Sequence, residues 1–205
     1  EAEPLLRRAI ERNPYAAIAH HYLGLVEKAR GRAAESVAAL NRAVEINPSF
    51  APAYGALANM LGRMGQPQAG IEHALYALRL SPRDASAGIW WLFAGEIQLE
   101  LGQDDLALEW IGRAVALNPR GPFGIGVLAA THALRGDSKE ARKVAARLRA
   151  AQPTLTLDRM VERLVVTSQA GHEPKRLIAG LRLAFGPEDE DGAPFLKVAA
   201  ASRSW

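Results

Sequence analysis

Five of the twelve prolines recur at a nearly constant interval, and this repeat constrains the fold more than any other feature of the chain. They are Pro14, Pro48, Pro82, Pro119 and Pro153, separated by 34, 34, 37 and 34 residues. A glycine stands 17 residues before each of the last four prolines, at Gly31, Gly65, Gly102 and Gly136. Glycine can end a helix in a left-handed conformation and proline cannot continue one. Each period therefore predicts two helices joined as a hairpin.

The second half of each period is amphipathic. In the first period Ser36, Leu40 and Ala43 recur at positions i, i+4 and i+7, and later periods repeat this pattern with small or apolar residues. A single hairpin of this size cannot bury both of its helices, whereas stacked hairpins share one continuous core. We therefore predict an all-α fold, an α-solenoid of stacked helix-turn-helix hairpins.

The composition excludes several classes of protein. Hydrophobic residues make up 49% of the 205 residues and charged residues 23%, as in folded globular domains. The net charge of +3 comes without a basic run, so we predict no direct binding of nucleic acid. No stretch approaches the ~20 apolar residues that cross a bilayer, and we predict a cytoplasmic chain without membrane contact. The absence of cysteine excludes disulfides and thiolate zinc sites.

These residues resemble the tetratricopeptide repeat (TPR) family, whose 34-residue unit is a helix-turn-helix. The second unit carries the loose family signature as Tyr54, Leu57, Ala58, Ala77 and Pro82. The resemblance implies four repeats, at 17–50, 51–84, 85–121 and 122–155, the third with three inserted residues. Outside them we expect the second helix of a truncated repeat at 1–16, C-terminal capping helices at 156–185 and a mostly disordered tail at 186–205.

Both ends of the array point to a larger protein. Because residues 1–16 match only half of a repeat, we expect a fragment of a bacterial protein that continues upstream of Glu1. The segment 175–188 is similar to the ends of TPR regions that follow a class III adenylate or guanylate cyclase domain, or a winged-helix DNA-binding domain, in bacterial regulators. This resemblance implies a regulatory C-terminal array. Leu148 stands where the family has a small residue, and we expect it to push the next helix outward.

No pattern of residues indicates catalysis, a cofactor or a metal. Gly124, Gly126 and Ala129 fit a loose dinucleotide-binding pattern, but that pattern requires a preceding strand, whereas here prolines and a helical repeat surround it. We expect these glycines to thin a helix so that a neighbour can approach. The five histidines lack metal-ligand spacing. We predict that the chain is not an enzyme and holds no cofactor or metal.

The resemblance also implies a binding groove on the concave side, lined by the first helix of each repeat. At the positions of the two-carboxylate clamp of chaperone adaptors this chain has His21, Leu25, Ala56, Ile89 and Phe93, so an apolar helix or extended peptide is the expected ligand rather than an acidic chaperone tail. Trp90 is a candidate exposed aromatic anchor, beside the expected core residue Trp91. The expected groove residues are Ile18, His21, Tyr22, Leu25, Asn59, Arg63, Ile89, Leu92, Phe93, Glu96 and Phe123, together with Gly126 and Ala130.

Two functions of different classes follow. The first is a non-catalytic scaffold that binds a partner polypeptide, or the upstream domain of its own protein, in the groove. The second is the regulatory or oligomerising segment of a signalling enzyme or transcriptional regulator, in which the expected helix from about 173 to 185 acts in cis. A third, a small enzyme, is disfavoured because no catalytic constellation is evident. The sequence leaves the partner and the oligomeric state open.

Overall fold

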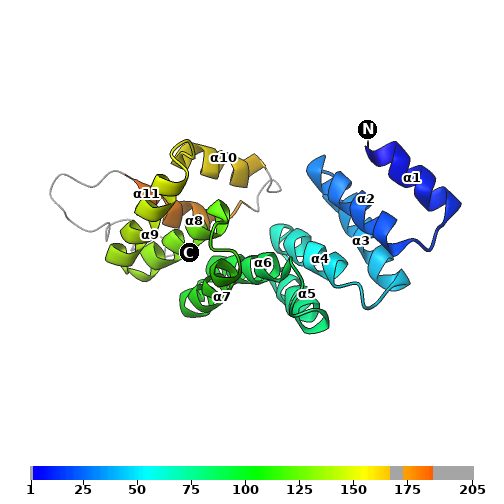
Figure 1. Cartoon of the computed structure of the whole chain (residues 1–205), viewed down its shortest axis with the longest axis horizontal. Helices are drawn as coiled ribbons and strands as arrows, with labels where there is room; N and C mark the ends of the chain where they lie inside the picture. Colours follow the sequence, from blue (N-terminus) through cyan, green and yellow to red (C-terminus); the bar gives the residue numbers. More distant parts are fainter. Residues whose placement is uncertain (1, 167–172, 187–205) are drawn as a thin grey trace.

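The computed structural model describes residues 2–166 and 173–186, and these residues form eleven α-helices and no strand (Figure 1). The first nine form a curved array, and α10 and α11 follow at its C-terminal end. None of the described helices is long and apolar enough to span a bilayer. The helices are α1 (Ala2–Arg12), α2 (Ala17–Ala29), α3 (Ala33–Ile46), α4 (Ala51–Arg63), α5 (Pro67–Leu80), α6 (Ala87–Glu100), α7 (Asp104–Leu117), α8 (Pro122–Arg135), α9 (Ser138–Ala151), α10 (Leu157–Val166) and α11 (Lys175–Phe185).

The turns lie where glycine and proline predict them. Gly31, Gly65, Gly102 and Gly136 have φ angles of 74° to 89°, in the left-handed region that favours glycine. Each of them lies between the two helices of a hairpin, and each second helix ends shortly before one of the recurring prolines. The predicted all-α solenoid of TPR-like hairpins is confirmed. The limits assigned to each repeat stay an interpretation of the sequence.

Small residues in the first helix of a hairpin admit large side chains from the second. A Cβ atom at Gly24 would lie 2.6 Å from Cγ of Leu40, and one at Gly95 would lie 2.5 Å from Cγ1 of Ile111. Both Leu40 and Ile111 are completely buried. The two helices of these hairpins therefore approach each other more closely than any side chain larger than hydrogen would allow.

The two tryptophans of α6 are buried to different extents than expected from the sequence. Trp90 is only 2% exposed, because its indole occupies the space left by Gly55, where a Cβ atom would lie 2.0 Å from Nε1. Trp91, expected in the core, is half-buried and packs against Trp110 and Arg113. The prediction of Trp90 as an exposed anchor is therefore wrong in this structure.

The C-terminal helices do not continue the stack as another hairpin. α11 packs along α8 and also contacts α6 and α9. A Cβ atom at Gly180 would lie 2.7 Å from the carbonyl oxygen of Ala130, so the two backbones are almost in contact. Around Gly126, the side chains of Leu148, Met160 and Leu181 come together within 3.7 Å of the position a Cβ would take. Leu148 thus packs beneath α10 and α11, and it is buried. The expected tail beyond residue 186 lies outside the described residues.

Ion pairs join the N-terminal helix to the rest of the array. Glu27 of α2 is only 1% exposed and pairs with Arg32 at 2.6 Å and with Arg7 of α1 at 3.2 Å. Glu3 of α1 pairs with Arg7 at 2.8 Å, with Arg32 at 3.0 Å and with Arg30. α1 itself has no buried residue. The network therefore adds charge interactions to the contact between α1 and the first complete hairpin.

Candidate functional site

The concave side of the array contains a groove of about 1120 Å³. It is lined mainly by residues of α2, α4, α6, α8 and α10 and of the loops beside them, and also by Ala33 of α3 and Ala114 of α7. Its apolar wall includes five of the residues expected from the sequence: Leu25, Ile89, Leu92, Phe93 and Phe123. Within this wall Ile89 is 48% exposed, whereas Leu92 is 7% exposed. The groove thus presents apolar surface to solvent between the first helices of successive hairpins.

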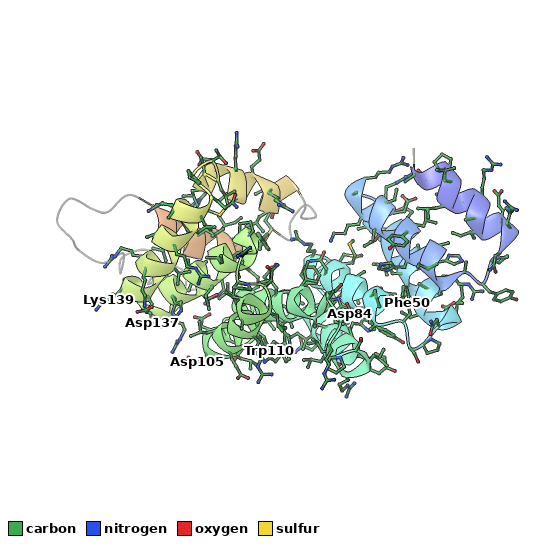
Figure 2. All side chains as sticks on the ribbon, viewed as in Figure 1. Phe50, Asp84, Asp105, Trp110, Asp137 and Lys139 are labelled. Carbon is green, nitrogen blue, oxygen red and sulfur yellow. The ribbon has the colours of Figure 1, made fainter. Side chains whose placement is uncertain are left out.

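The remaining expected residues lie in three different environments. Asn59 and Arg63 line the groove beside the apolar wall, and Glu96 lines an adjoining cleft. Ile18 and Tyr22 are 57% and 51% exposed on α2 and do not belong to the described lining. His21 is buried, with its ring against those of Tyr22 and Phe50, which is labelled in Figure 2. Burial lowers the pKa of His21, so its ring favours the neutral form.

Lys28 is a groove residue that the sequence analysis missed. Its ammonium donates a hydrogen bond to Oδ1 of Asn59 and lies 5.9 Å from the ring centre of Phe93. Burial, and then the nearby guanidinium of Arg63, lower the pKa of Lys28 to about 8. The spacing from Leu25 to Lys28 is i, i+3, which places both residues on one face of α2, and this spacing was the signal available in the sequence.

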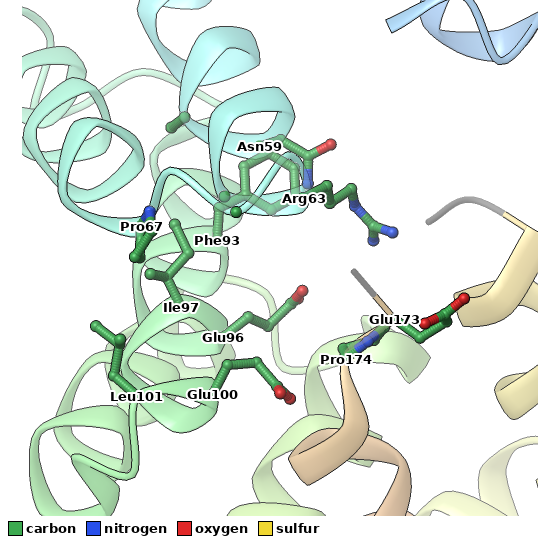
Figure 3. A pocket seen from close by; sticks show the side chains of 13 residues that line it. Asn59, Arg63, Pro67, Phe93, Glu96, Ile97, Glu100, Leu101, Glu173 and Pro174 are labelled. Carbon is green, nitrogen blue, oxygen red and sulfur yellow. The ribbon is translucent and has the colours of Figure 1, made fainter. Parts of the chain in front are cut away.

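The adjoining cleft, of about 220 Å³, lies between α4, α6 and the start of α11 (Figure 3). Glu96 and Glu100 project from α6 toward the space between Arg63 and Glu173. Burial raises the pKa of Glu96 to about 7, although the charge of Arg63 opposes this rise. Oε1 of Glu96 accepts no hydrogen bond from the described residues. The cleft therefore holds a carboxyl group that changes its charge near neutral pH.

α11 is held on the concave face of α8 by polar contacts at both of its ends. The carboxylate of Glu100 accepts hydrogen bonds from the backbone N–H groups of Arg176, at 3.2 Å, and Leu177, at 2.8 Å. These are N–H groups of the first turn, which have no partner within the helix. The guanidinium of Arg176 donates to both oxygens of Asp104, and Arg149 donates to the carbonyl oxygen of Phe185 at the other end. The helix is thus capped by side chains of α6, α7 and α9.

The fourth hairpin consequently presents a different surface from the first three. Gly126 and Ala130, which we expected to face a ligand, face Leu181 and Gly180 of α11 instead. Both residues are buried. The open part of the groove therefore runs from α2 to the first turn of α8, and α11 covers the rest of α8. The described residues include no group of three or more His, Asp or Glu side chains that could hold a metal ion.

Comparison with known proteins assigns the family. The family model described as tetratricopeptide repeat matches residues 1–49 and 56–122, more than half of the chain. The chain belongs to the tetratricopeptide repeat family. TPR proteins generally mediate protein–protein interactions and are typically non-enzymatic scaffolds. No curated protein matches the sequence.

Solved TPR structures share the fold of this TPR chain at low sequence identity. YrrB, described as a TPR protein with an unusual peptide-binding site, is similar with a TM-score of 0.63 and 22% identity, over 100% of both chains. PilW, described as a widely conserved type IV pilus biogenesis factor, has a TM-score of 0.70 and 20% identity, over 91% of this chain and 86% of its own. A thermophilic TPR protein of Thermus thermophilus has a TM-score of 0.64 and 23% identity, over 80% of this chain and 87% of its own. At these identities the likeness supports the fold alone.

Proposed function

We propose that this TPR chain is a non-catalytic interaction module that binds a polypeptide in the open part of its concave groove. The supporting observation is the accessible apolar wall, with Ile89 48% exposed, beside the polar groups of Lys28, Asn59 and Arg63. Apolar grooves with a few fixed polar groups suit side chains and backbone groups of a bound peptide together. The expected groove residues Ile18 and Tyr22 would extend the surface toward the N-terminal end.

The expected ligand is an apolar helix or an extended peptide with at least one large side chain. Such a side chain would pack against Phe93 and Ile89, while the ammonium of Lys28 and the guanidinium of Arg63 would donate hydrogen bonds to carbonyl or carboxylate oxygens of the ligand. Both cations are close enough for each to affect the other, since Arg63 lowers the pKa of Lys28. The charge of Glu96 already offsets part of this repulsion, since it raises the pKa of Lys28, and acceptor oxygens of a ligand would add to that effect.

The second candidate is a regulatory or oligomerising segment of a larger bacterial signalling protein, such as a nucleotide cyclase or a winged-helix regulator. The position of α11 favours it, because this helix already lies on the concave face of the fourth hairpin as an intramolecular ligand would. In this alternative the groove partner is the parent protein's own upstream domain, and the protein acts in the cytoplasm.

Selection of ligands from a displayed random peptide library against the full chain tests the first proposal. We expect selected peptides to lose affinity about tenfold when Ile89 is changed to Asp, because a charge in the apolar wall removes a central contact. Leu5→Asp is the matched control, because Leu5 is 65% exposed on α1, which does not belong to the described lining of the groove. Failure to select any peptide, or selected peptides that bind both variants as tightly as the unchanged chain, would contradict the proposal.

A further inference from the structure

The cleft between α4, α6 and the start of α11 contains a carboxyl oxygen without a hydrogen bond. Oε1 of Glu96 is buried, and it accepts no hydrogen bond from any described residue. Figure 3 shows the Glu96 side chain projecting into the cleft beside that of Glu100. The two carboxyl groups differ, because Glu100 already accepts two N–H groups of α11. Since buried polar groups are normally hydrogen-bonded, Oε1 of Glu96 is an acceptor suited to a donor from a ligand.

Much of the remaining lining of the cleft is apolar. Phe93, Ile97 and Leu101 recur at positions i, i+4 and i+8 of α6, and Pro67 lies at the start of α5 (Figure 3). Leu101 is 42% exposed, so part of this apolar surface is open to a ligand. The volume of about 220 Å³ is below that of pockets for drug-sized molecules and suits a single side chain. The cleft therefore fits a short apolar stem that ends in a hydrogen-bond donor.

The cleft is continuous with the open groove. Asn59, Arg63 and Phe93 line both of them. Along α6 the distance from Ile89 of the groove to Glu96 of the cleft is about 10 Å, at 1.5 Å per residue. An extended peptide covers this distance in about three residues. A peptide that packs against Ile89 can therefore place a nearby side chain in the cleft.

The charges around Glu96 favour an uncharged ligand group. Burial raises the pKa of Glu96 to about 7, although Arg63 and Lys28 oppose the rise, and Glu100 adds to it. A cationic ligand group would meet Arg63 and Lys28, and an anionic group would meet the three carboxyl groups of Glu96, Glu100 and Glu173. A primary carboxamide carries no charge, donates through its NH2 group and accepts through its oxygen. It can therefore pair with the carboxylate or with the carboxylic acid form of Glu96.

We propose that the cleft is a subsite for the primary carboxamide of a glutamine side chain in the bound peptide. Its NH2 group donates to Oε1 of Glu96, and its two methylene groups pack against the apolar side chains of α6. Its oxygen accepts a hydrogen bond from the NH2 group of Asn59, whose own oxygen accepts one from Lys28. A peptide without such a donor leaves Glu96 unsatisfied, so the subsite adds specificity to the apolar groove. The inference rests on the proposed function for the peptide, but small amides test the cleft by itself.

Titration of the full chain with four small probes, followed by nuclear magnetic resonance, tests the proposal. The probes are butyramide, pentan-2-one, butylammonium and butyrate, which are similar in length. We expect butyramide to shift the backbone amide signals of Phe93, Glu96 and Ile97. It should bind about tenfold more tightly than pentan-2-one, in which a methyl group replaces the NH2 group and cannot donate. Its affinity should be similar at pH 6 and pH 8, because both forms of Glu96 can pair with it.

Substitution of Glu96 shows whether this carboxyl group is the acceptor. Glu96→Met removes the acceptor at similar length and should abolish the preference for butyramide over pentan-2-one. It should not lower the free energy of unfolding, because an apolar side chain replaces an unsatisfied buried group. Glu45→Met is the matched control, since the Glu45 side chain is 61% exposed on α3 outside the cleft, and it should retain the preference. The comparison of probes on the unchanged chain decides the question even where a variant fails to fold.

Each other result overturns the proposal. Equal binding of butyramide and pentan-2-one would show an apolar cleft without polar recognition. Tighter binding of butylammonium or of butyrate would show a site for a charged group. No shift with any probe, or a preference that survives in Glu96→Met, would show that Glu96 binds no ligand in the cleft.

The peptide selection separates this inference from the proposed function. Selected peptides that bind without a glutamine would overturn the glutamine subsite and leave the peptide groove intact. Binding of butyramide that depends on Glu96, in a chain for which no peptide can be selected, would leave the carboxamide site intact and refute the proposed function. Since Ile89 does not line the cleft, Ile89→Asp should weaken the selected peptides and leave the affinity for butyramide unchanged.

Discussion

The two ends of the array are closed by different kinds of interaction. At the N-terminal end α1 has no buried residue, its Leu5 is 65% exposed, and the ion pairs of Glu3 and Glu27 attach it to α2 and the turn that follows. At the C-terminal end α11 buries Leu177 and Leu181 almost completely against the last hairpin. Burial of apolar surface is a large stabilising contribution that salt does not screen, whereas partly exposed ion pairs contribute little and are screened. The C-terminal end should therefore be the more stable of the two.

Truncation of one leucine at each end gives the largest expected contrast. Leu181→Ala removes a buried side chain and leaves a cavity beside Gly126, so we expect the free energy of unfolding to fall by about 3 kcal/mol. Leu5→Ala changes an exposed side chain and should alter it by less than about 0.5 kcal/mol. Urea unfolding followed by circular dichroism measures both. If both substitutions lowered the free energy of unfolding equally, the two ends would not differ in how much apolar burial stabilises them.

The close approach of α11 to α8 gives the next contrast, between two glycines in helices. Gly180→Ala places a Cβ atom 2.7 Å from the carbonyl oxygen of Ala130, so the helices must separate, and we expect a loss of about 2 kcal/mol. Gly112→Ala in α7 meets nothing within 4 Å and should stabilise the chain by about 0.5 kcal/mol through helix propensity. The same unfolding measurement applies. A stabilising effect of Gly180→Ala would mean that α11 does not lie against α8 in solution.

The hairpins could be predicted because their signals are local. A left-handed glycine and a proline each act on a few neighbouring residues, so their spacing specified the helices and the solenoid without knowledge of tertiary contacts. The position of α11 could not be predicted in this way. Its amphipathic pattern requires one buried face but does not say which helix covers that face, and the small residues that receive it, Gly126 and Ala130, lie about fifty residues earlier.

Only part of the groove could be predicted from the sequence. The family resemblance located first-helix positions such as Ile89 and Phe93, which line the groove. It did not identify Lys28, whose long side chain extends from α2 to Asn59 of α4. It also did not predict that the space beside Gly55 holds the indole of Trp90. Both features depend on the distance between neighbouring hairpins, and no pattern within one repeat encodes that distance.

The cap of α11 makes the C-terminal end sensitive to pH. Burial raises the pKa of Glu100, while hydrogen bonds from the backbone of Leu177 and Arg176 oppose the rise. A carboxyl whose pKa is higher in the folded state contributes stability below its unfolded pKa and loses it as the pH rises through the folded pKa. Glu100→Gln keeps one acceptor oxygen but does not titrate. We expect it to cost about 1 kcal/mol at pH 5 and less at pH 8, as urea unfolding at the two pH values would measure. A cost that grows toward pH 8 would contradict this account.

The ion pairs of α1 give the smallest effect and the one that depends on salt. Glu3 is 14% exposed in its side chain, but its partners Arg7, Arg30 and Arg32 are 38% to 53% exposed, so solvent screens most of their attraction. Glu3→Gln should therefore destabilise α1 by about 0.5 kcal/mol at low ionic strength and by almost nothing at 1 M salt, where the Debye length is about 3 Å. Hydrogen exchange of the α1 amides at both salt concentrations measures this, with Glu11→Gln as the matched control for loss of a negative charge on the same helix. The exchange of the α11 amides should not respond to either substitution, because that helix is held by its own buried leucines and its own polar caps. A salt-independent effect of Glu3→Gln would instead assign the attachment of α1 to packing, and the two ends would then be closed by the same kind of interaction.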